Sequence, residues 1–336
     1  MSIPEKLMRT VCRVGSRIVY GSAEEADWVY EKIQRPSSYF LVARNLLNWK
    51  LRRPRVHGVV ALMVEAAFDC NLKCAYCHRT KIPAHLQQRP RLMDWETFCA
   101  VVDQAPASVE TVQLCGMGEP TLHPRLCDMI GHIALRGRRP SMFTNGTLLK
   151  GDLLARLAKT PLAVLNVSVE PDEQTCREFR GIDLDTIRRN IRQFLAAKRP
   201  STEVKVRMVA HPGNAELVAK AAEEWRREVQ GVKIGNVFNM KEGHHTNFTC
   251  MEPWGSNLFV FTDGKMSPCA MDMFKDLVIG DIHEQTFDEI IHSRAYRDIL
   301  EKFARGEPPS LCASCSEVRL EGIPSLLPRA PGRGKR

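Results

Sequence analysis

VVALMVEAAFDCNLKCAYC, residues 59–77, is the stretch of sequence that decides the fold. Its first half, 59–68, is an almost continuous apolar run of strand length. Such runs are typical of strands in a parallel sheet that helices cover on both faces. Its second half places three cysteines within eight residues, directly after the run. The stretch therefore predicts a buried strand that leads into a cysteine-rich loop.

The same strand pattern recurs along the chain. Strand-type runs occur at 59–68, 110–115, 139–144, 162–170, 202–210 and 231–238. Helical stretches separate them, near 94–105, 124–136, 150–158, 183–198 and 214–229. Asp94 is placed to cap the first of these helices. Six β/α alternations predict an α/β fold with a parallel sheet. Because a closed barrel of this kind needs eight, we expect an open, partial (β/α)6 TIM-like barrel over 58–240.

Residues suited to chemistry follow the predicted strands. The cysteine run comes after the first strand, GMGEP (116–120) after the second and TNG (144–146) after the third, and Ser168 closes the fourth. In β/α barrels the chemistry collects at the carboxyl ends of the strands. We therefore expect these segments to meet at one edge of the sheet.

The two ends of the chain are basic. Residues 1–57 are expected to form a helical extension, with a candidate helical face made of Tyr39, Phe40, Val42, Leu46, Leu47 and Leu51. That helix could lie on a membrane surface, and we favour packing against the main domain. The Pro/Gly-rich residues 326–336 are expected to form a disordered basic tail.

Residues 241–325 predict a small C-terminal module. Asp263-Gly264 is a strong hairpin turn signal, and a helix is expected over 285–305. The apolar core of such a module would be small, so a bound metal is expected to stabilise it.

Composition excludes several classes of protein. The 336 residues are 44% hydrophobic and 26% charged, which is ordinary for a globular protein and excludes a disordered or fibrous chain. No apolar run approaches the ~18 residues of a spanning helix, and the start shows no secretory signal, so we expect a cytoplasmic protein. The net charge of +9 is interpreted as solvated surface rather than as a nucleic-acid footprint.

Twelve cysteines point to metal or redox chemistry, since a disulfide framework is unexpected in this compartment. Cys70, Cys74 and Cys77 form a C-x3-C-x2-C run. Three thiolates on one loop would leave one iron of a 4Fe–4S cluster without a protein ligand, open to a small chelating molecule. The alternative interpretation is three incidental cysteines or an incomplete zinc site. Five other cysteines match no ligand spacing and are expected to be small buried hydrophobic residues: Cys12, Cys99, Cys115, Cys127 and Cys176.

CNLKCAYC after the first strand resembles the signature of the radical S-adenosylmethionine (SAM) enzymes. The resemblance implies that the amino and carboxylate groups of SAM chelate the open iron. One electron then cleaves SAM to methionine and a 5′-deoxyadenosyl radical, which abstracts a hydrogen atom from the substrate. Tyr76 offers an aromatic face beside the last cysteine.

GMGEP is similar to the GGEP motif of that family, which receives the methionine amino group. Met117 stands where a glycine is common, but the Gly118-Glu119-Pro120 part is intact. Gly118 permits a close backbone approach, and Glu119 can accept charge-assisted hydrogen bonds from an ammonium group. The alternative for this tripeptide is a plain turn.

Further matches to the family are softer. Ser168 resembles the serine that contacts the ribose of SAM, and Arg180, in FRG, resembles the arginine that binds its carboxylate. A helix cap and a surface ion pair are the respective alternatives. Asn145 is a further candidate SAM contact.

Cys250, Cys269, Cys312 and Cys315 fall in a C-x18-C-x42-C-x2-C pattern. Four thiolates can enclose a second 4Fe–4S cluster, although they are a common zinc set as well. The pattern resembles the SPASM domain and its shortened twitch form, and the cysteine count favours one auxiliary cluster. Asp272 lies three residues past Cys269 and is a weak candidate for a general base; its alternative is a solvated turn carboxylate.

The resemblance implies a radical SAM oxidoreductase or maturase with a reduced flavodoxin or ferredoxin as electron donor. The leading hypothesis is oxidation of a small carbohydrate- or cyclitol-like molecule, with the auxiliary cluster as electron acceptor. Modification of a ribosomally made peptide and redox-neutral epimerisation stay open. A metal-binding protein that interacts with RNA is the remote, non-catalytic alternative.

Overall fold

The fold is seen in a computed structural model that describes residues 35–82, 89–210, 213–236, 250–272, 274–313 and 315. Its strands form one nine-stranded sheet in the order β6-β5-β4-β3-β2-β1-β7-β8-β9. The expected tail at 326–336 and the first 34 residues of the expected N-terminal extension lie outside the described residues.

The six predicted strands are present and mutually parallel. They are β1 (Ala61–Val64), β2 (Thr111–Leu114), β3 (Arg139–Thr144), β4 (Val164–Ser168), β5 (Glu203–Ala210) and β6 (Gly231–Asn236). The sheet does not close on itself, so the predicted α/β fold with an open, partial barrel is confirmed.

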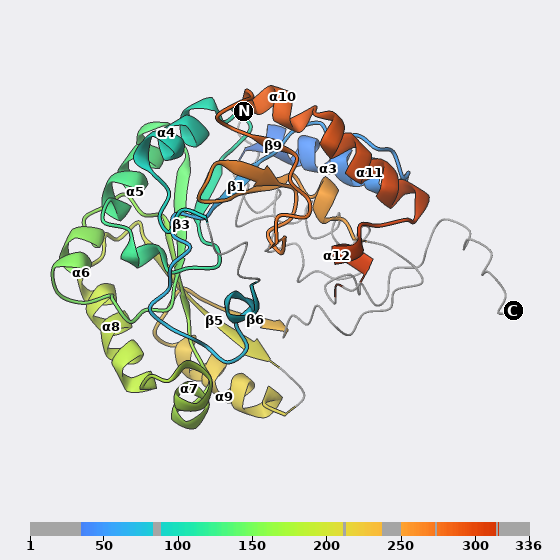
Figure 1. Cartoon of the computed structure of the whole chain (residues 1–336). Coiled ribbons are helices and arrows are strands. Elements are labelled where there is room, and N and C mark those ends of the chain that lie inside the picture. Colours follow the sequence, from blue (N-terminus) through green and yellow to red (C-terminus); the bar gives the residue numbers. More distant parts are fainter. Residues whose placement is uncertain are drawn as a thin grey trace, which may run out of the picture.

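Helices cover the outer side of this sheet (Figure 1). They are α4 (Trp95–Gln104), α5 (Leu126–Leu135), α6 (Gly151–Leu157), α7 (Glu173–Arg180), α8 (Leu184–Ala197) and α9 (Ala215–Trp225). Asp94 caps α4 as predicted, because its Oδ1 accepts the Thr97 N–H at 2.7 Å. The sequence did not predict α7, which Asp172 caps and Gly181 ends in the left-handed conformation at φ 68°.

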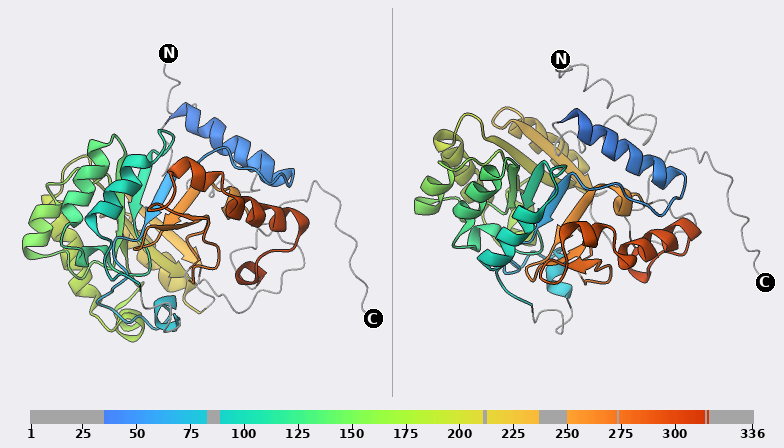
Figure 2. Two further views of the ribbon diagram at one scale, coloured as in Figure 1. Left: turned by 45° about the horizontal axis from the view of Figure 1, so that its top comes forward. Right: turned by 90° about the horizontal axis from the view of Figure 1, so that it is seen from above.

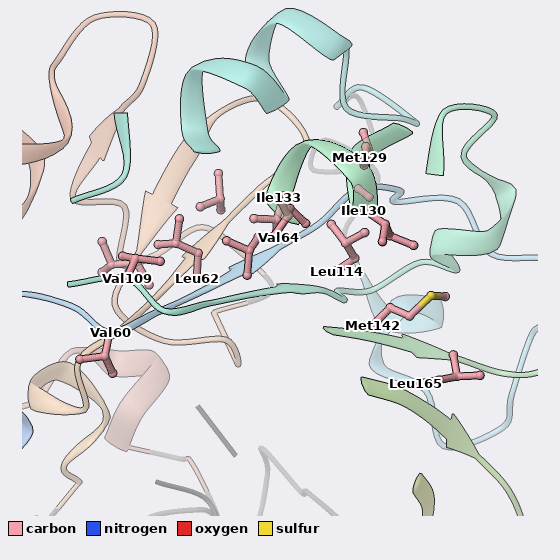
Figure 3. Packing of buried hydrophobic residues seen from close by; sticks show 14 of the residues in the cluster. Val60, Leu62, Val64, Val109, Leu114, Met129, Ile130, Ile133, Met142 and Leu165 are labelled. Atoms are coloured by element: carbon pink, nitrogen blue, oxygen red, sulfur yellow. The ribbon is translucent and has the colours of Figure 1, made fainter. Parts of the chain in front are cut away.

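The core lies between the sheet and these helices. Figure 3 shows Leu62 and Val64 of β1 beside Ile130 and Ile133 of α5, and all four side chains are fully buried. Burial of each such side chain stabilises the fold by about 1.5–3 kcal/mol. The core therefore fixes β1, and with it the start of the cysteine loop.

The C-terminal region extends the barrel sheet. The hairpin of β7 (Asn257–Val260) and β8 (Lys265–Ser267) turns at Gly264, whose φ is +80°, as predicted. Strand β7 also pairs in parallel with β1, with Val64 opposite Val260, and β9 (Gly280–Asp281) completes the sheet. The predicted module boundaries, 58–240 and 241–325, remain a prediction, but their strands share one sheet.

Two helical predictions need correction. The helix expected over 285–305 is two helices, α10 (Phe287–Ile291) and α11 (Arg294–Arg305), because Ser293 accepts the Tyr296 N–H and starts the second. A short helix, α12 (Ser310–Ala313), follows.

The N-terminal helix α3 (Pro36–Lys50) buries only part of the predicted set of residues: Val42 and Leu46 are buried and Tyr39 is partly buried. Trp49 is also buried, whereas Phe40, Leu47 and Leu51 are 72%, 54% and 45% exposed. At 100° per residue the predicted set mixes two faces of the helix. The buried face also carries polar side chains, Asn45 among them, which hide it from a hydrophobicity pattern.

Asn45 ties α3 to the sheet. Its Nδ2 donates to the Gly58 carbonyl at 3.0 Å and to Ser256 Oγ at 2.6 Å, just before β7. Trp254, in the short 3-10 helix η4 (Glu252–Trp254), donates to the Arg53 carbonyl at 2.9 Å. Both views of Figure 2 show blue α3 and red α11 away from the green barrel helices. The buried side chains of α3 nevertheless join the same core cluster as those of β1 and β7, so the main-domain packing that we favoured for α3 is found.

Candidate functional site

Cys70, Cys74 and Cys77 lie on the loop between β1 and the 3-10 helix η1 (His78–Lys81). The loop is held by the Cys77 N–H, which donates to the Cys74 carbonyl at 3.1 Å, and by the Leu72 N–H, which donates to Cys70 Sγ at 3.4 Å. Burial raises the pKa of both Cys70 and Cys74, and the neighbouring cysteines raise it further. The three thiols are therefore close enough to interact electrostatically, and a cationic group among them would favour their thiolate forms.

The chemistry of this donor set, three cysteine thiols on one loop, fits an iron–sulfur cluster. A cubane cluster has its irons at separate corners, so its cysteine ligands lie further apart than those of zinc. Three thiols on one loop suit three corners of such a cluster.

Gly118 brings the GMGEP segment against the cysteine loop. A Cβ on this residue would lie 2.3 Å from the Ala67 carbonyl oxygen and 2.4 Å from that of Asp69. The Glu119 N–H also donates to the Asp69 carbonyl at 2.7 Å. The absence of a side chain at Gly118 thus lets two strand-end segments meet just before Cys70.

Glu119 is buried, and its carboxylate bonds to its own protein neighbours. Oε1 accepts the Thr121 N–H at 3.0 Å and the hydroxyls of Thr121 and Thr144 at 2.6 and 2.7 Å, and Oε2 accepts the Asn145 N–H at 2.7 Å. Burial raises the pKa of Glu119, while these hydrogen bonds oppose the rise. Its carboxylate therefore joins the ends of β2 and β3, and its predicted contact with an ammonium group stays a prediction.

Asn145 reaches the cysteine loop from the end of β3. Its Nδ2 donates to Asn71 Oδ1 at 3.0 Å and lies 3.9 Å from Cys70 Sγ. Asn71 in turn donates to Thr147 Oγ1 at 2.8 Å. Asn145 therefore connects the end of β3 to Cys70 and Asn71 of the cysteine loop. The predicted contact of Asn145 with SAM stays a prediction.

Tyr76, Ser168 and Arg180 also come together, through a residue that sequence reasoning missed. The buried Glu170 accepts hydrogen bonds from the Tyr76 hydroxyl and from Arg180 Nε, the latter at 2.7 Å. Arg180 Nη1 donates to the Ser168 carbonyl at 3.1 Å. Burial alone would lower the pKa of Arg180, but Tyr76 and Glu170 raise it above its usual value. The only sequence signal for Glu170 was a carboxylate at the end of a predicted strand.

This arrangement holds α7 against the cysteine loop. The Ala75 N–H donates to the Phe179 carbonyl at 2.8 Å, and the rings of Tyr76 and Phe179 have centroids 5.8 Å apart. The Arg180 side chain is only 7% exposed. It is an internal ion-pair partner, which corrects the alternative of a surface ion pair.

The auxiliary cysteines come from four places in the C-terminal region. Cys250 precedes η4, Cys269 follows β8, Cys312 lies in α12, and the Cys315 N–H donates to the Cys312 carbonyl at 3.2 Å. Burial raises the pKa of Cys250 and Cys269 well above the usual value, and other members of the set contribute to the rise in each. Burial also raises the pKa of Cys312 to about 12, with Cys315 as the next cause. Four interacting thiols, on one buried cysteine (Cys312) and three half-buried ones, fit a cluster with four cysteine ligands.

Asp272 is a turn carboxylate, but it is buried rather than solvated. It accepts the N–H groups of Asp276 and Leu277 at 2.8 and 3.0 Å. Burial raises the pKa of Asp272, and a hydrogen bond from Ser267 is among the opposing causes. These bonds organise the turn after Cys269 and favour a structural role over that of a general base.

A second unpredicted carboxylate, Glu65, lies directly after β1. It is fully buried, accepts the Met117 N–H at 3.1 Å and has Arg89 Nη2 3.5 Å from its Oε1. A Cβ on Gly116 would lie 2.7 Å from Glu65 Cγ. Glu65 therefore fits under the GMGEP segment, on the strand that leads into the cysteine loop.

The cysteines without ligand spacing are a mixed group. Cys115 and Cys176 are buried as expected, but Cys99 and Cys127 are partly exposed, and Cys12 lies outside the described residues.

None of the helices in the described ranges is long and apolar enough to cross a membrane.

Family comparisons agree with the two cysteine sets. The Radical SAM superfamily matches residues 64–223, and an iron–sulfur cluster-binding domain, SPASM, matches residues 250–316. The first range contains Cys70, Cys74 and Cys77, and the second contains all four auxiliary cysteines. These domains imply a SAM-binding 4Fe–4S cluster and additional iron–sulfur chemistry.

Curated relatives are similar at low identity. A tungsten-containing aldehyde ferredoxin oxidoreductase cofactor-modifying protein of Pyrococcus furiosus is 29% identical over 43% of the chain, a match that spans only 42% of that relative. An S-adenosyl-L-methionine-dependent 2-deoxy-scyllo-inosamine dehydrogenase of Niallia circulans is 25% identical over 77% of the chain and 93% of its own length. A solved structure of anSMEcpe with bound AdoMet superposes with a TM-score of 0.58 at 17% identity, covering 73% of this chain and 83% of that one. This last likeness shows a shared fold.

Proposed function

Because the chain belongs to the radical SAM superfamily and carries a SPASM iron–sulfur domain, we propose that it oxidises a small carbohydrate- or cyclitol-like molecule. The observation that carries this proposal is the similarity to the inosamine dehydrogenase, which extends across 93% of that relative. It extends over 77% of this chain, whereas the match to the Pyrococcus relative spans less than half of either chain.

Cys70, Cys74 and Cys77 would hold the first cluster, which together with SAM supplies a hydrogen-abstracting radical when both are bound. The residues around the loop position its ends. Asn145 contacts Cys70, and Tyr76 is fixed by Glu170. Arg180, held on two sides by Glu170 and Ser168, keeps its guanidinium beside Cys74, which is one of the groups that raise its pKa.

Cys250, Cys269, Cys312 and Cys315 would hold the second cluster. Four protein ligands leave no corner for a substrate, which favours a role in electron transfer. Oxidation of an alcohol to a ketone removes two electrons and two protons. One electron and one proton leave as the abstracted hydrogen atom, so the substrate must still lose one electron to an acceptor and one proton to a base.

The first electron has to come from a reductant, for which flavodoxin or ferredoxin is the class that we predict. A peptide is the alternative substrate class, and SAM cleavage by protein that forms no ketone from any cyclitol in the test below would favour it.

The test uses protein reconstituted anaerobically with iron and sulfide. With SAM and dithionite, it should form 5′-deoxyadenosine, and with a cyclitol or amino-cyclitol substrate it should form a ketone. Cys74→Ala should abolish SAM cleavage. Cys312→Ala should keep some cleavage but lose ketone formation, and full ketone formation by this variant would refute the electron-accepting role. Cys99→Ala, at a cysteine outside both sets, is the matched control and should behave as wild type.

A further inference from the structure

Four unpartnered polar atoms lie together where β1 and β7 end. Over the described part of the chain, seven buried side-chain nitrogen or oxygen atoms have no hydrogen-bond partner. Four of the seven are Glu65 Oε2, Arg89 Nε, Thr262 Oγ1 and Asp263 Oδ1. Buried polar atoms are nearly always hydrogen-bonded, because an unmade bond costs free energy. Their concentration at one place therefore points to a ligand.

The pairing of the strands brings these residues together. Val64 lies opposite Val260, and the Glu65 N–H donates to the Val260 carbonyl at 2.8 Å. The backbone of Thr262 lies close enough to the Glu65 carboxylate to lower its pKa, although burial raises that pKa overall. Arg89 Nη2 lies 3.5 Å from Glu65 Oε1. Thr262 and Asp263 are neighbours in the hairpin turn, so the four residues form one group, which we call the strand-end cluster.

The charges around the cluster are balanced once Lys275, which lies against it, is counted. Glu65 pairs with Arg89, and Asp263 pairs with Lys275. With two acidic and two basic side chains, no net charge remains for an ionic ligand to neutralise. The polar atoms left over are two carboxylate oxygens that accept, one guanidinium N–H that donates and one hydroxyl that does both.

This unused set matches hydroxyl groups. A hydroxyl can donate to a carboxylate oxygen and accept from the guanidinium N–H at the same time. A peptide unit offers one N–H and one carbonyl, so it is poorer in donors than two adjacent hydroxyls or a hydroxyl next to an amine. Neighbouring hydroxyl and amino groups on one ring therefore fit the strand-end cluster better than a peptide backbone.

The cluster has a closed end and a more open end. Glu65 and Thr262 are fully buried, and Arg89 is fixed against the Phe68 ring at 3.8 Å from its centroid. The side chains of Lys275 and Asp263 keep 14% and 22% of their exposure. A polar ring would thus approach from the Asp263–Lys275 side and reach toward Glu65.

The cluster also adjoins the GMGEP segment. Glu65 accepts the Met117 N–H of that segment at 3.1 Å. A group bound here would therefore lie beside the segment that meets the start of the cysteine loop at Gly118.

We propose that the strand-end cluster binds a polyhydroxylated ring, a cyclitol or sugar with neighbouring hydroxyl or amino groups, through Glu65, Arg89, Thr262 and Asp263. This inference rests on the proposed function and names the residues that recognise its substrate.

Thr262→Val tests the proposal, because it removes the unpartnered hydroxyl and keeps the shape of the side chain. Thr202→Val is the matched control: Thr202 is also buried, but its hydroxyl donates to the Leu162 carbonyl at 2.7 Å. Binding of scyllo-inositol, 2-deoxy-scyllo-inosamine and glucose is measured by calorimetry on the reconstituted protein with SAM. We expect at least one of these probes to bind to wild-type protein. Thr262→Val should weaken the binding of that probe by about tenfold and leave the melting temperature unchanged. Thr202→Val should lower the melting temperature and leave the affinity for the probe unchanged.

Two results would overturn the proposal: no binding of any of the three probes to wild type that cleaves SAM normally, or equal binding by wild type and Thr262→Val. SAM cleavage is measured in the same samples without a probe. If a probe binds and Thr262→Val weakens it while SAM is not cleaved, the strand-end cluster stands and the proposed chemistry fails. The two inferences can therefore fail separately.

Discussion

Replacement of Gly118 by alanine places a methyl group in space that the backbone of the cysteine loop already occupies. The added Cβ would lie 2.3 Å from the Ala67 carbonyl oxygen, 2.4 Å from that of Asp69 and 2.6 Å from the Phe68 carbonyl carbon. Each distance is well below ordinary van der Waals contact, and all three atoms belong to backbone that cannot rotate away. The GMGEP segment or the start of the cysteine loop must therefore move.

Overpacking of this kind costs about 3 kcal/mol when neighbouring backbone has to shift. In a chain of this size, that corresponds to a fall in melting temperature of roughly 5 °C or more. Because the shift occurs directly before Cys70, we also expect less iron per chain after reconstitution. Differential scanning fluorimetry and iron analysis under anaerobic conditions measure the two effects.

Gly131→Ala is the matched control. Gly131 lies within α5, and an added Cβ would meet nothing within 4 Å. Alanine at an open helical position stabilises by about 0.5–1 kcal/mol, so this variant should melt slightly higher than wild type and bind the same amount of iron. A Gly118→Ala protein with wild-type melting temperature and iron content would refute the close approach of the two segments.

Three further predictions concern single side chains. Glu170→Gln should lower the free energy of unfolding by about 3 kcal/mol, because it leaves the buried Arg180 charge without its partner. Tyr76→Phe removes one hydrogen bond to Glu170 and should lower that free energy by only about 1 kcal/mol. Equal losses for the two variants in a denaturant titration would contradict this arrangement. Asp94→Asn should keep the cap of α4 but remove its acid dependence. Partial burial alone would raise the Asp94 pKa, but the hydrogen bonds from Thr97 lower it below its usual value. The stability that the Asp94 carboxylate contributes is therefore present above about pH 4 and is lost as the pH falls through that lowered pKa. Melting curves between pH 5 and 3 that fall equally steeply for both proteins would exclude this contribution. Phe40→Asp should leave the melting temperature nearly unchanged, whereas Val42→Asp should lower it strongly, because only the second variant places a charge in the core. Equal effects of the two variants would show that the buried face of α3 is assigned wrongly.

The sequence predicted the features of the fold that rest on local pattern. Strand-type apolar runs identified β1 to β6. The run of β1 is almost continuous, as in strands covered on both faces, whereas β5 alternates between buried apolar and half-buried residues. Helix α7 was missed because its sequence, EQTCREFR, is mostly polar, and it buries only Cys176 and Arg180. Its cap at Asp172 and its end at Gly181 were readable signals that the hydrophobic pattern did not support.

Pairing between distant segments could not be predicted in the same way. The hairpin turn at Asp263-Gly264 is a local signal and was recognised, but the parallel pairing of β7 with β1 depends on the packing of the whole chain. The strand-end cluster follows from that pairing, so Thr262 and Glu65 had no reason to be linked from sequence alone.

The candidate site shows the same division. Motif residues such as Asn145 and Gly118 were identified, and the structure brings both to the cysteine loop. Glu170 and Glu65 belong to no quoted motif, yet each occupies a buried position at a strand end. Glu65 lies inside the predicted run 59–68 and Glu170 is the last residue of the predicted run 162–170. A rule that treats every carboxylate within or at the end of a predicted parallel strand as a candidate would have included both.

The central claim is that the loop of Cys70, Cys74 and Cys77 leaves one iron of its cluster open to SAM. Mössbauer spectroscopy of anaerobic, iron-57-labelled protein tests it most directly, recorded with and without SAM. The account predicts about eight irons per chain in two 4Fe–4S clusters, and a change at a single iron site when SAM is added, which Cys70→Ala abolishes. Zinc in place of iron, or spectra that SAM leaves unchanged in wild-type protein, would contradict it.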